Sequence, residues 1–279
     1  MRLLLFRSLW TNGFDLAAAL QDCRGGAFDG VEGPVPAGVA ERAGFAAALA
    51  AAAVPFVAEI VTGGGYVPVE ASAERQLEDF SRQAEAALDC QPLFLTVLAG
   101  CDAWPMALSV EFLGRALERA RELGVTASFE THRSRPTFHP WATRRLLEQL
   151  PALRLTCDFS HWCCVCERLV LETEPEILAL CAARAHHVHA RVGYAQGPQV
   201  PHPAAPEHRG ALEAHERWWD AIWRAQAGRG TVTMTPEFGP DGYLQRQPFT
   251  DEPVADLDAI NRWMAERQRE RFLSLAVPC

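Results

Sequence analysis

Eight short apolar segments, rich in β-branched and aromatic residues, alternate with longer segments of helical periodicity along the whole chain of 279 residues. Eight strands, each followed by a helix, in a chain of this length predict a single (β/α)8 TIM barrel of the α/β class. The expected strands are Leu3–Leu9, Phe28–Glu32, Val54–Val61, Leu93–Leu98, Thr126–Glu130, Arg154–Asp158, His186–Arg191 and Thr231–Glu237. The expected helices lie at 14–23, 38–52, 72–89, 106–123, 140–149, 174–184, 210–227 and 253–273.

A doubly wound sheet is the alternative fold. It usually has fewer strands, and it would need a phosphate-binding loop after an early strand. Gly63, Gly64 and Gly65 follow an expected strand but lack the GxGxxG or GxxxxGK[ST] spacing, so we expect a turn there. No linker, low-complexity tract or repeat divides the sequence, so we expect one domain over residues 1–279.

Charge and cysteine content limit the class of protein. The net charge is -9, which argues against a nucleic-acid partner. The sequence contains no lysine, which excludes mechanisms that need a lysine base or Schiff base. Only four apolar residues separate Arg2 from Arg7, too few for a signal peptide, and no window reaches transmembrane length. With nine irregularly spaced cysteines, we expect reduced thiols, a cytoplasmic location and no membrane partner.

Side chains able to bind a metal stand at the carboxyl ends of the last four expected strands. In a (β/α)8 barrel these ends form one rim, where the reactive residues lie. The strands end in the segments SFETHR, LTCDFSHW, HHVHAR and TMTPEFGP. The residues concerned are Glu130, His132, Asp158, His161, His187, His189, Arg191 and Glu237.

The charge of this group favours a metal site. A single carboxylate at a strand end is usually a helix cap or an ion-pair partner, and a single buried histidine is usually a core residue. Three carboxylates converging with an imidazole would be strongly disfavoured without a cation. Such a donor set suits one divalent ion, Mn²⁺ first, with Mg²⁺, Co²⁺ or Zn²⁺ as alternatives.

The order Glu…Asp-x-x-His…His-x-His-x-Arg…Glu resembles the xylose isomerase-like TIM-barrel superfamily, and so does FDGVE at the second strand. The resemblance implies that Glu130, Asp158, His189 and Glu237 bind the metal, and that the two glutamates also transfer protons. It implies a substrate-binding role for His161. We group Arg191, His132 and His187 with it as expected substrate contacts. Arg191 follows the metal-binding histidine sooner than the corresponding arginine of the epimerases does.

The activity that the resemblance implies is metal-dependent isomerisation or epimerisation of a sugar, sugar phosphate or small hydroxy-keto compound, through a metal-bound cis-enediolate. A dehydratase of a keto-inositol type substrate is one alternative. An endonuclease IV-like hydrolase is another, although that enzyme needs histidines from strands two and three, and the first histidine here is His132. The expected partner is a carbohydrate-like small molecule, with a homo-oligomer left open.

Three further features have competing interpretations. Cys163, Cys164 and Cys166 lack a second CxxC motif, so we expect packing thiols and not a zinc site. Arg133 and Arg135 either hold an anionic group of the substrate or pair with surface carboxylates. The proline-rich loop after the seventh strand is expected to form a wall of the pocket.

Overall fold

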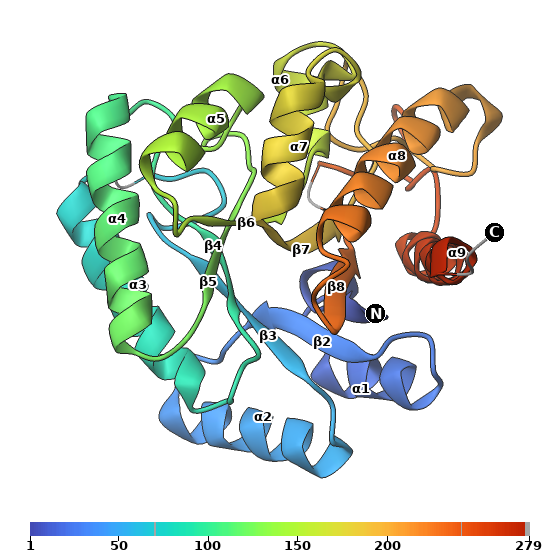
Figure 1. The fold of residues 1–279 in the computed structure, drawn as a ribbon. Helices are drawn as coiled ribbons and strands as arrows, with labels where there is room; N and C mark the ends of the chain where they lie inside the picture. Colours follow the sequence, from blue (N-terminus) through green and yellow to red (C-terminus); the bar gives the residue numbers. More distant parts are fainter. Residues whose placement is uncertain (70, 241, 277–279) are drawn as a thin grey trace.

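The computed structural model describes residues 1–69, 71–240 and 242–276. Its strands form one closed parallel barrel in which each strand pairs with its chain neighbours and β8 closes on β1, so the expected (β/α)8 fold is confirmed. The strands occupy the centre and the helices surround them (Figure 1). The strands are β1 (Arg2–Ser8), β2 (Gly30–Pro34), β3 (Phe56–Val61), β4 (Leu95–Leu98), β5 (Ala127–Glu130), β6 (Arg154–Cys157), β7 (Ala185–Ala190) and β8 (Thr231–Pro236).

The outer helices follow the expected segments closely. They are α1 (Leu16–Arg24), α2 (Val39–Ala52), α3 (Ala73–Leu88), α4 (Met106–Glu122), α5 (Pro140–Gln149), α7 (Pro175–Arg184), α8 (Arg209–Ala225) and α9 (Leu257–Ala276). A short helix that the sequence did not predict, α6 (Ser160–Val165), follows β6. The last helix begins four residues later than expected, so the loop after β8 is longer. None of the described helices is long and apolar enough to span a bilayer.

Four of the expected strands extend one residue too far at their carboxyl ends, the first of them at Leu9 and the other three at predicted rim residues. Asp158, Arg191 and Glu237 each stand immediately after the end of a strand, at the start of the loop on the rim. The second strand is shifted towards the C-terminus relative to the expectation, because Asp29 accepts a hydrogen bond from the Leu5 amide before β2 begins. Glu32 therefore lies in the middle of β2 and not at its end.

The inside of the barrel is layered. Phe6, Val57 and Phe94 form a small buried apolar cluster inside the barrel. Above them, the Thr156 hydroxyl lies 2.8 Å from that of Thr96 and 2.9 Å from that of Ser128. The acidic and imidazole side chains lie above this layer, towards the carboxyl ends of the strands. The larger apolar core lies between the barrel and its helices, and it includes the buried Trp218, Trp219 and Trp223.

Candidate metal centre and active site

Four of the predicted rim residues converge on one point. Glu130, Asp158, His189 and Glu237 are buried, and each offers a ligand atom within 4.8 Å of the other three. The Nδ1 atom of His189 lies 3.1 Å from Glu237 Oε2 and 3.5 Å from Glu130 Oε2. The four side chains come from consecutive strands β5 to β8, so the barrel itself fixes their separation.

The residues present fit a divalent cation. His189 Nδ1 is buried and makes no hydrogen bond to any residue that the structure describes. A buried imidazole nitrogen without a partner is costly, whereas the same atom aimed at three carboxylates is a suitable metal ligand. The donor set of three carboxylates and one imidazole is compatible with Mn²⁺, Mg²⁺, Co²⁺ or Zn²⁺.

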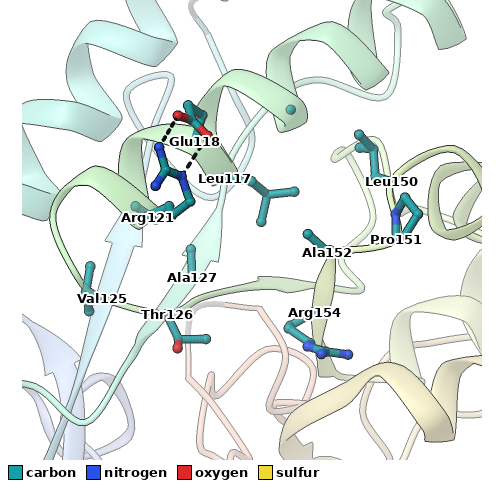
Figure 2. Close-up of a pocket in the computed structure, with 12 residues that line it drawn as sticks. Leu117, Glu118, Arg121, Val125, Thr126, Ala127, Leu150, Pro151, Ala152 and Arg154 are labelled. Atoms are coloured by element: carbon teal, nitrogen blue, oxygen red, sulfur yellow. Dashed lines mark hydrogen bonds and ion pairs between the residues drawn. The ribbon is translucent and has the colours of Figure 1, made fainter.

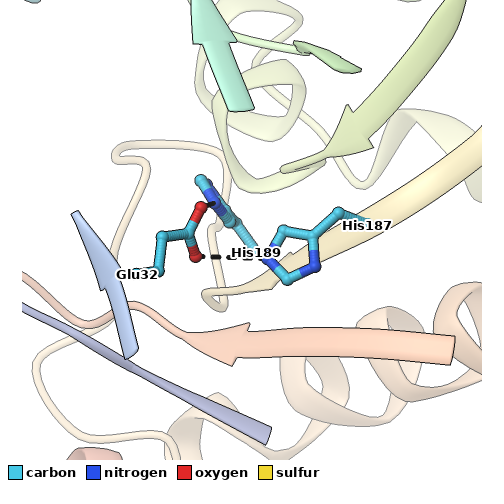
Figure 3. Close-up of side chains that lie close together, drawn as sticks. All are labelled: Glu32, His187 and His189. Carbon is cyan, nitrogen blue, oxygen red and sulfur yellow. Dashed lines mark hydrogen bonds and ion pairs between the residues drawn. The ribbon is translucent and has the colours of Figure 1, made fainter. Parts of the chain in front are cut away.

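The other ring nitrogen of His189 is held by a residue that the sequence analysis did not select. Glu32 Oε1 lies 3.0 Å from His189 Nε2, and the carboxylate lies between His189 and His187 (Figure 3). When a cation is bound, Glu32 would accept the proton on Nε2, and the lone pair of Nδ1 would point towards the cation. This is the carboxylate–histidine–metal arrangement that orients ligands in many metal sites.

His187 belongs to this supporting network and not to the substrate cavity. Its Nδ1 lies 2.7 Å from Thr233 Oγ1, and its Nε2 lies 2.9 Å from Thr235 Oγ1 and 3.2 Å from Glu32 Oε2. Thr235 also donates a hydrogen bond to Glu32. The expectation that His187 binds substrate does not fit this position. With both ring nitrogens partnered, the group formed with Glu32 and His189 is a hydrogen-bond network and not a second metal site.

The shifted pKa values of Glu130, Asp158 and His189 indicate that their cluster has an excess of negative charge. Burial, together with nearby Glu237 and Asp158, raises the pKa of Glu130 to about 7. Burial also raises the pKa of Asp158, despite the opposing effect of Arg191. Burial alone would lower the pKa of His189, but the surrounding carboxylates of Glu237, Glu32 and Glu130 raise it well above its usual value. A bound cation would relieve all three effects.

Arg191 is fixed against the same carboxylates. It is 2% exposed; its Nε lies 3.1 Å from Asp158 Oδ2, and Nη2 pairs with that carboxylate and lies 3.2 Å from Glu237 Oε2. The Tyr243 ring covers the guanidinium at 4.5 Å. Its Nη1 atom has no hydrogen-bond partner among the described residues. Arg191 therefore offers one free donor group beside the cluster, which fits the expected contact with substrate.

His161 and His132 lie next to this arginine. Their ring centroids are 4.0 Å apart, and His161 Nε2 lies 3.0 Å from Arg191 Nη2 and 3.9 Å from Glu130 Oε1. Burial and neighbouring positive charges lower the pKa of both histidines well below the usual value. Both are therefore neutral rings at the edge of the cluster. The short helix α6 places His161 there.

A small cavity adjoins the cluster. It measures about 20 Å³, room for about one water-sized group. Its walls are Trp10, Glu59, Tyr66, Leu98, Glu130, His132, Arg191, Glu237 and Tyr243. Trp10 and Tyr243 pack edge to face with their ring centroids 5.4 Å apart. Trp10 also packs on Gly239, where a Cβ atom would meet its ring at 1.8 Å, so this position requires glycine.

Glu59 is a cavity residue that the sequence analysis did not select. It lies on β3, is 8% exposed and lines the cavity together with Tyr66. Burial and the nearby carboxylates of Glu237, Glu32 and Glu130 raise the pKa of Glu59 to about 8. A glutamate within the apolar segment VPFVAEIV was a detectable signal, because glutamate is rarely buried without a function or a partner.

The remaining candidate groups lie outside the cavity. Arg135 donates to the carbonyl oxygens of Thr62, at 3.2 Å, and Gly100, at 3.0 Å, so it fastens the loops after β3 and β4 together. Arg133 lies over the Tyr243 ring at 5.0 Å and has no carboxylate partner among residues 1–69, 71–240 and 242–276.

The loop after β8 contributes Tyr243 to the aromatic side chains that cover the cavity. None of the residues that line the cavity comes from the proline-rich loop after β7.

The cysteine cluster has a packing role, as expected. Within the described part of the chain, the candidate metal groups contain histidine and carboxylates but no cysteine. Cys163 is buried, with its sulfur 3.4 Å from the Phe159 carbonyl oxygen and 3.9 Å from His215 Nε2. Burial raises its pKa further, which keeps it a neutral thiol.

A larger surface hollow lies at the opposite ends of the strands. It measures about 480 Å³ and lies between α4, the start of β5 and the start of β6 (Figure 2). Glu118 and Arg121 pair with each other at its edge, and most of its other side chains are apolar. No group of possible metal ligands among the described residues lies there. The candidate metal ligands of the described residues all lie at the other face.

Comparison with known proteins identifies similar structures only. No family model and no curated protein sequence matches the chain. The solved IolI protein with a bound zinc atom is 13% identical over 99% of this chain and 100% of its own, with a TM-score of 0.67. D-allulose 3-epimerase from Methylomonas sp. is 15% identical over 97% and 98%, with a TM-score of 0.63. Endonuclease IV from Thermus thermophilus is 15% identical over 99% and 100%, with a TM-score of 0.59.

Proposed function

We propose that this chain, which has the fold of the xylose isomerase-like TIM-barrel superfamily, is a divalent-metal-dependent isomerase or epimerase of a small hydroxy-carbonyl compound. One observation supports the proposal above the others. Three buried carboxylates and the unpartnered Nδ1 of His189 converge beside a cavity lined by further polar groups. Similar structures include an epimerase and a zinc-containing protein. We further propose Mn²⁺ as the native ion.

The bound metal would act as the electrophile that stabilises negative charge on adjacent carbonyl and hydroxyl oxygens of the substrate. Glu130 and Glu237 both line the cavity, so either carboxylate is able to take a proton from carbon while the other returns one. His161 and Arg191 lie on one side of these glutamates, where they orient the substrate oxygens. Trp10 and Tyr243 cover the cavity, which in this closed arrangement holds about one water-sized group, so both rings must move aside to admit a substrate.

A DNA-cleaving role has less support. Endonuclease IV-like chemistry would need histidine ligands from the second and third strands, whereas β2 and β3 carry Glu32 and Glu59. A net charge of -9 also opposes binding to a phosphodiester backbone. Elimination of water from a keto-polyol needs the same proton abstraction, so a dehydratase is the nearest chemical alternative.

Direct assay separates these activities. Metal-free protein is supplied with Mn²⁺, Mg²⁺, Co²⁺ or Zn²⁺ and incubated with ketoses, aldoses, their phosphate esters and hydroxy-keto acids. We expect a metal-dependent conversion to a product of unchanged mass. Loss of the mass of one water molecule would identify a dehydratase, and cleavage of abasic DNA without sugar conversion would identify a nuclease. Either result would refute the proposed isomerase.

A further inference from the structure

Glu59 and Tyr66 form a polar wall opposite the cationic side of the cavity. Glu59 comes from β3, and Tyr66 comes from the loop that follows it. The cationic side consists of Arg191, which follows β7, and the neutral rings of His132 and His161 lie next to it. Tyr66 also packs against Trp10, with ring centroids 5.8 Å apart. Glu59 and Tyr66 therefore line the cavity on a side where none of the candidate metal ligands lies.

The hydrogen bonding of Glu59 leaves capacity for a ligand. A carboxyl group has about four hydrogen-bonding positions, and the neighbouring Tyr66 hydroxyl takes up at most one of those of Glu59. Unlike Glu32, Glu59 forms no ion pair with a histidine of β7 within the described part of the chain, and it belongs to none of the candidate metal groups there. A carboxylate in this position is suited to accept hydrogen bonds from hydroxyl groups.

The arginines around the cavity do not form a phosphate site. Arg135 is bound to backbone carbonyl oxygens, and Arg133 lies on Tyr243 outside the cavity walls. Arg191 and a divalent ion together supply three formal positive charges, and Glu130, Asp158 and Glu237 supply three negative charges. The balance is reached before the carboxyl groups of Glu32 and Glu59 are counted. A phosphate dianion would then add uncompensated negative charge beside these two further acidic groups.

We propose, resting on the proposed function, that Glu59 and Tyr66 form a subsite for a substrate hydroxyl group, and that the substrate is a neutral polyhydroxylated carbonyl compound and not a phosphate ester. The metal side binds the reacting oxygens, and the Glu59 side binds a hydroxyl farther along the carbon chain. The subsite determines which substrates fit, and it takes no part in the proton transfer.

Binding measurements test this subsite without requiring turnover. Titration calorimetry on the Mn²⁺-loaded protein compares neutral ketopentoses and ketohexoses, each matched with its phosphate ester. We expect at least one neutral sugar to bind more tightly than its ester. Glu59→Gln is expected to weaken that binding by about 10- to 100-fold, the range for losing a hydrogen bond to a charged group. Tyr66→Phe is expected to weaken it less, and Tyr194→Phe, at a half-buried phenol outside the cavity, is the matched control.

A crossed comparison with the neighbouring strand separates the subsite from the metal site. Glu32→Gln is expected to weaken Mn²⁺ binding by about 10- to 100-fold, as for other groups that orient a metal ligand. Glu59→Gln is expected to leave Mn²⁺ affinity close to that of the parent while weakening sugar binding. Tighter binding of phosphate esters, absence of any neutral ligand in the panel, or unchanged sugar binding in Glu59→Gln would overturn the subsite. Glu59-dependent sugar binding without any turnover would instead refute only the proposed activity.

Discussion

Glu130→Gln and Glu237→Gln are each expected to lower kcat by about 10²- to 10⁴-fold, the usual contribution of a positioned proton-transfer group. Glutamine preserves the side-chain volume and one oxygen donor but cannot accept a proton from carbon. Both carboxylates line the cavity, and both lie near His189 Nδ1. The loss should therefore persist when the ion concentration is raised to saturation.

The measurement is steady-state kinetics at a metal concentration far above the Kd determined for each variant. Saturation separates the loss of a base from the loss of a ligand. Glu118→Gln is the control, because Glu118 is exposed and pairs with Arg121 on the surface of its own helix. Retention of more than about a tenth of the parent kcat in either site variant would contradict the proton-transfer role, because a tenth is above the whole expected range.

Removal of the metal is expected to abolish activity and to lower thermal stability. Without a cation, Glu130, Asp158 and Glu237 share one buried site at a cost in electrostatic free energy. Restoring an ion at about 100 times its Kd should raise the free energy of unfolding by about 2.7 kcal/mol. Scanning calorimetry of the chelated and reconstituted protein measures this difference, and elemental analysis measures the stoichiometry, expected to be one ion per chain.

Asp158→Asn provides the matched comparison for this stabilisation. It removes one ligand charge while keeping the side-chain shape, so the ion should raise the melting temperature less than in the parent. A protein with no bound metal after purification, whose melting temperature is unchanged by Mn²⁺, Mg²⁺, Co²⁺ and Zn²⁺, would refute the metal centre.

Much of the fold could be predicted because its determinants are local. Alternating apolar segments and helical periodicity indicated the order of the strands and helices, and the closed barrel confirms it. The rim residues Glu130, Asp158, His189 and Glu237 could be selected because each stands at or near the end of a strand, and a parallel barrel brings all such ends to one face. Their positions at the strand ends were enough to predict that these four residues lie close together.

Residues missed by the sequence analysis act across the barrel. Glu32 contacts His189 on β7, 157 positions away, so nothing local marks it as a partner of that histidine. Glu59 becomes part of the cavity only when β3 and the loop after β8 meet above the barrel. Tyr243 was missed because the position of a long loop depends on tertiary packing, here on Trp10 and Arg191.

His187 illustrates the limit of strand alternation. It points to the same side of β7 as His189, and this pattern made it a candidate for substrate contact. The structure shows that it lies one level deeper, where threonine hydroxyls and Glu32 satisfy both ring nitrogens. Alternation predicts which side of the strand a residue faces but not its depth within the barrel.

The fate of the substrate hydrogen tests the central claim most directly. The metal-loaded protein converts its best substrate in D₂O, and the product is examined by NMR and mass spectrometry. Proton transfer through Glu130 and Glu237 predicts deuterium on the reacting carbon, incorporated during turnover and about 10²- to 10⁴-fold more slowly in a parallel incubation with Glu237→Gln. Complete retention of the substrate's own hydrogen in every product, after long incubation, would contradict this mechanism and indicate a hydride shift.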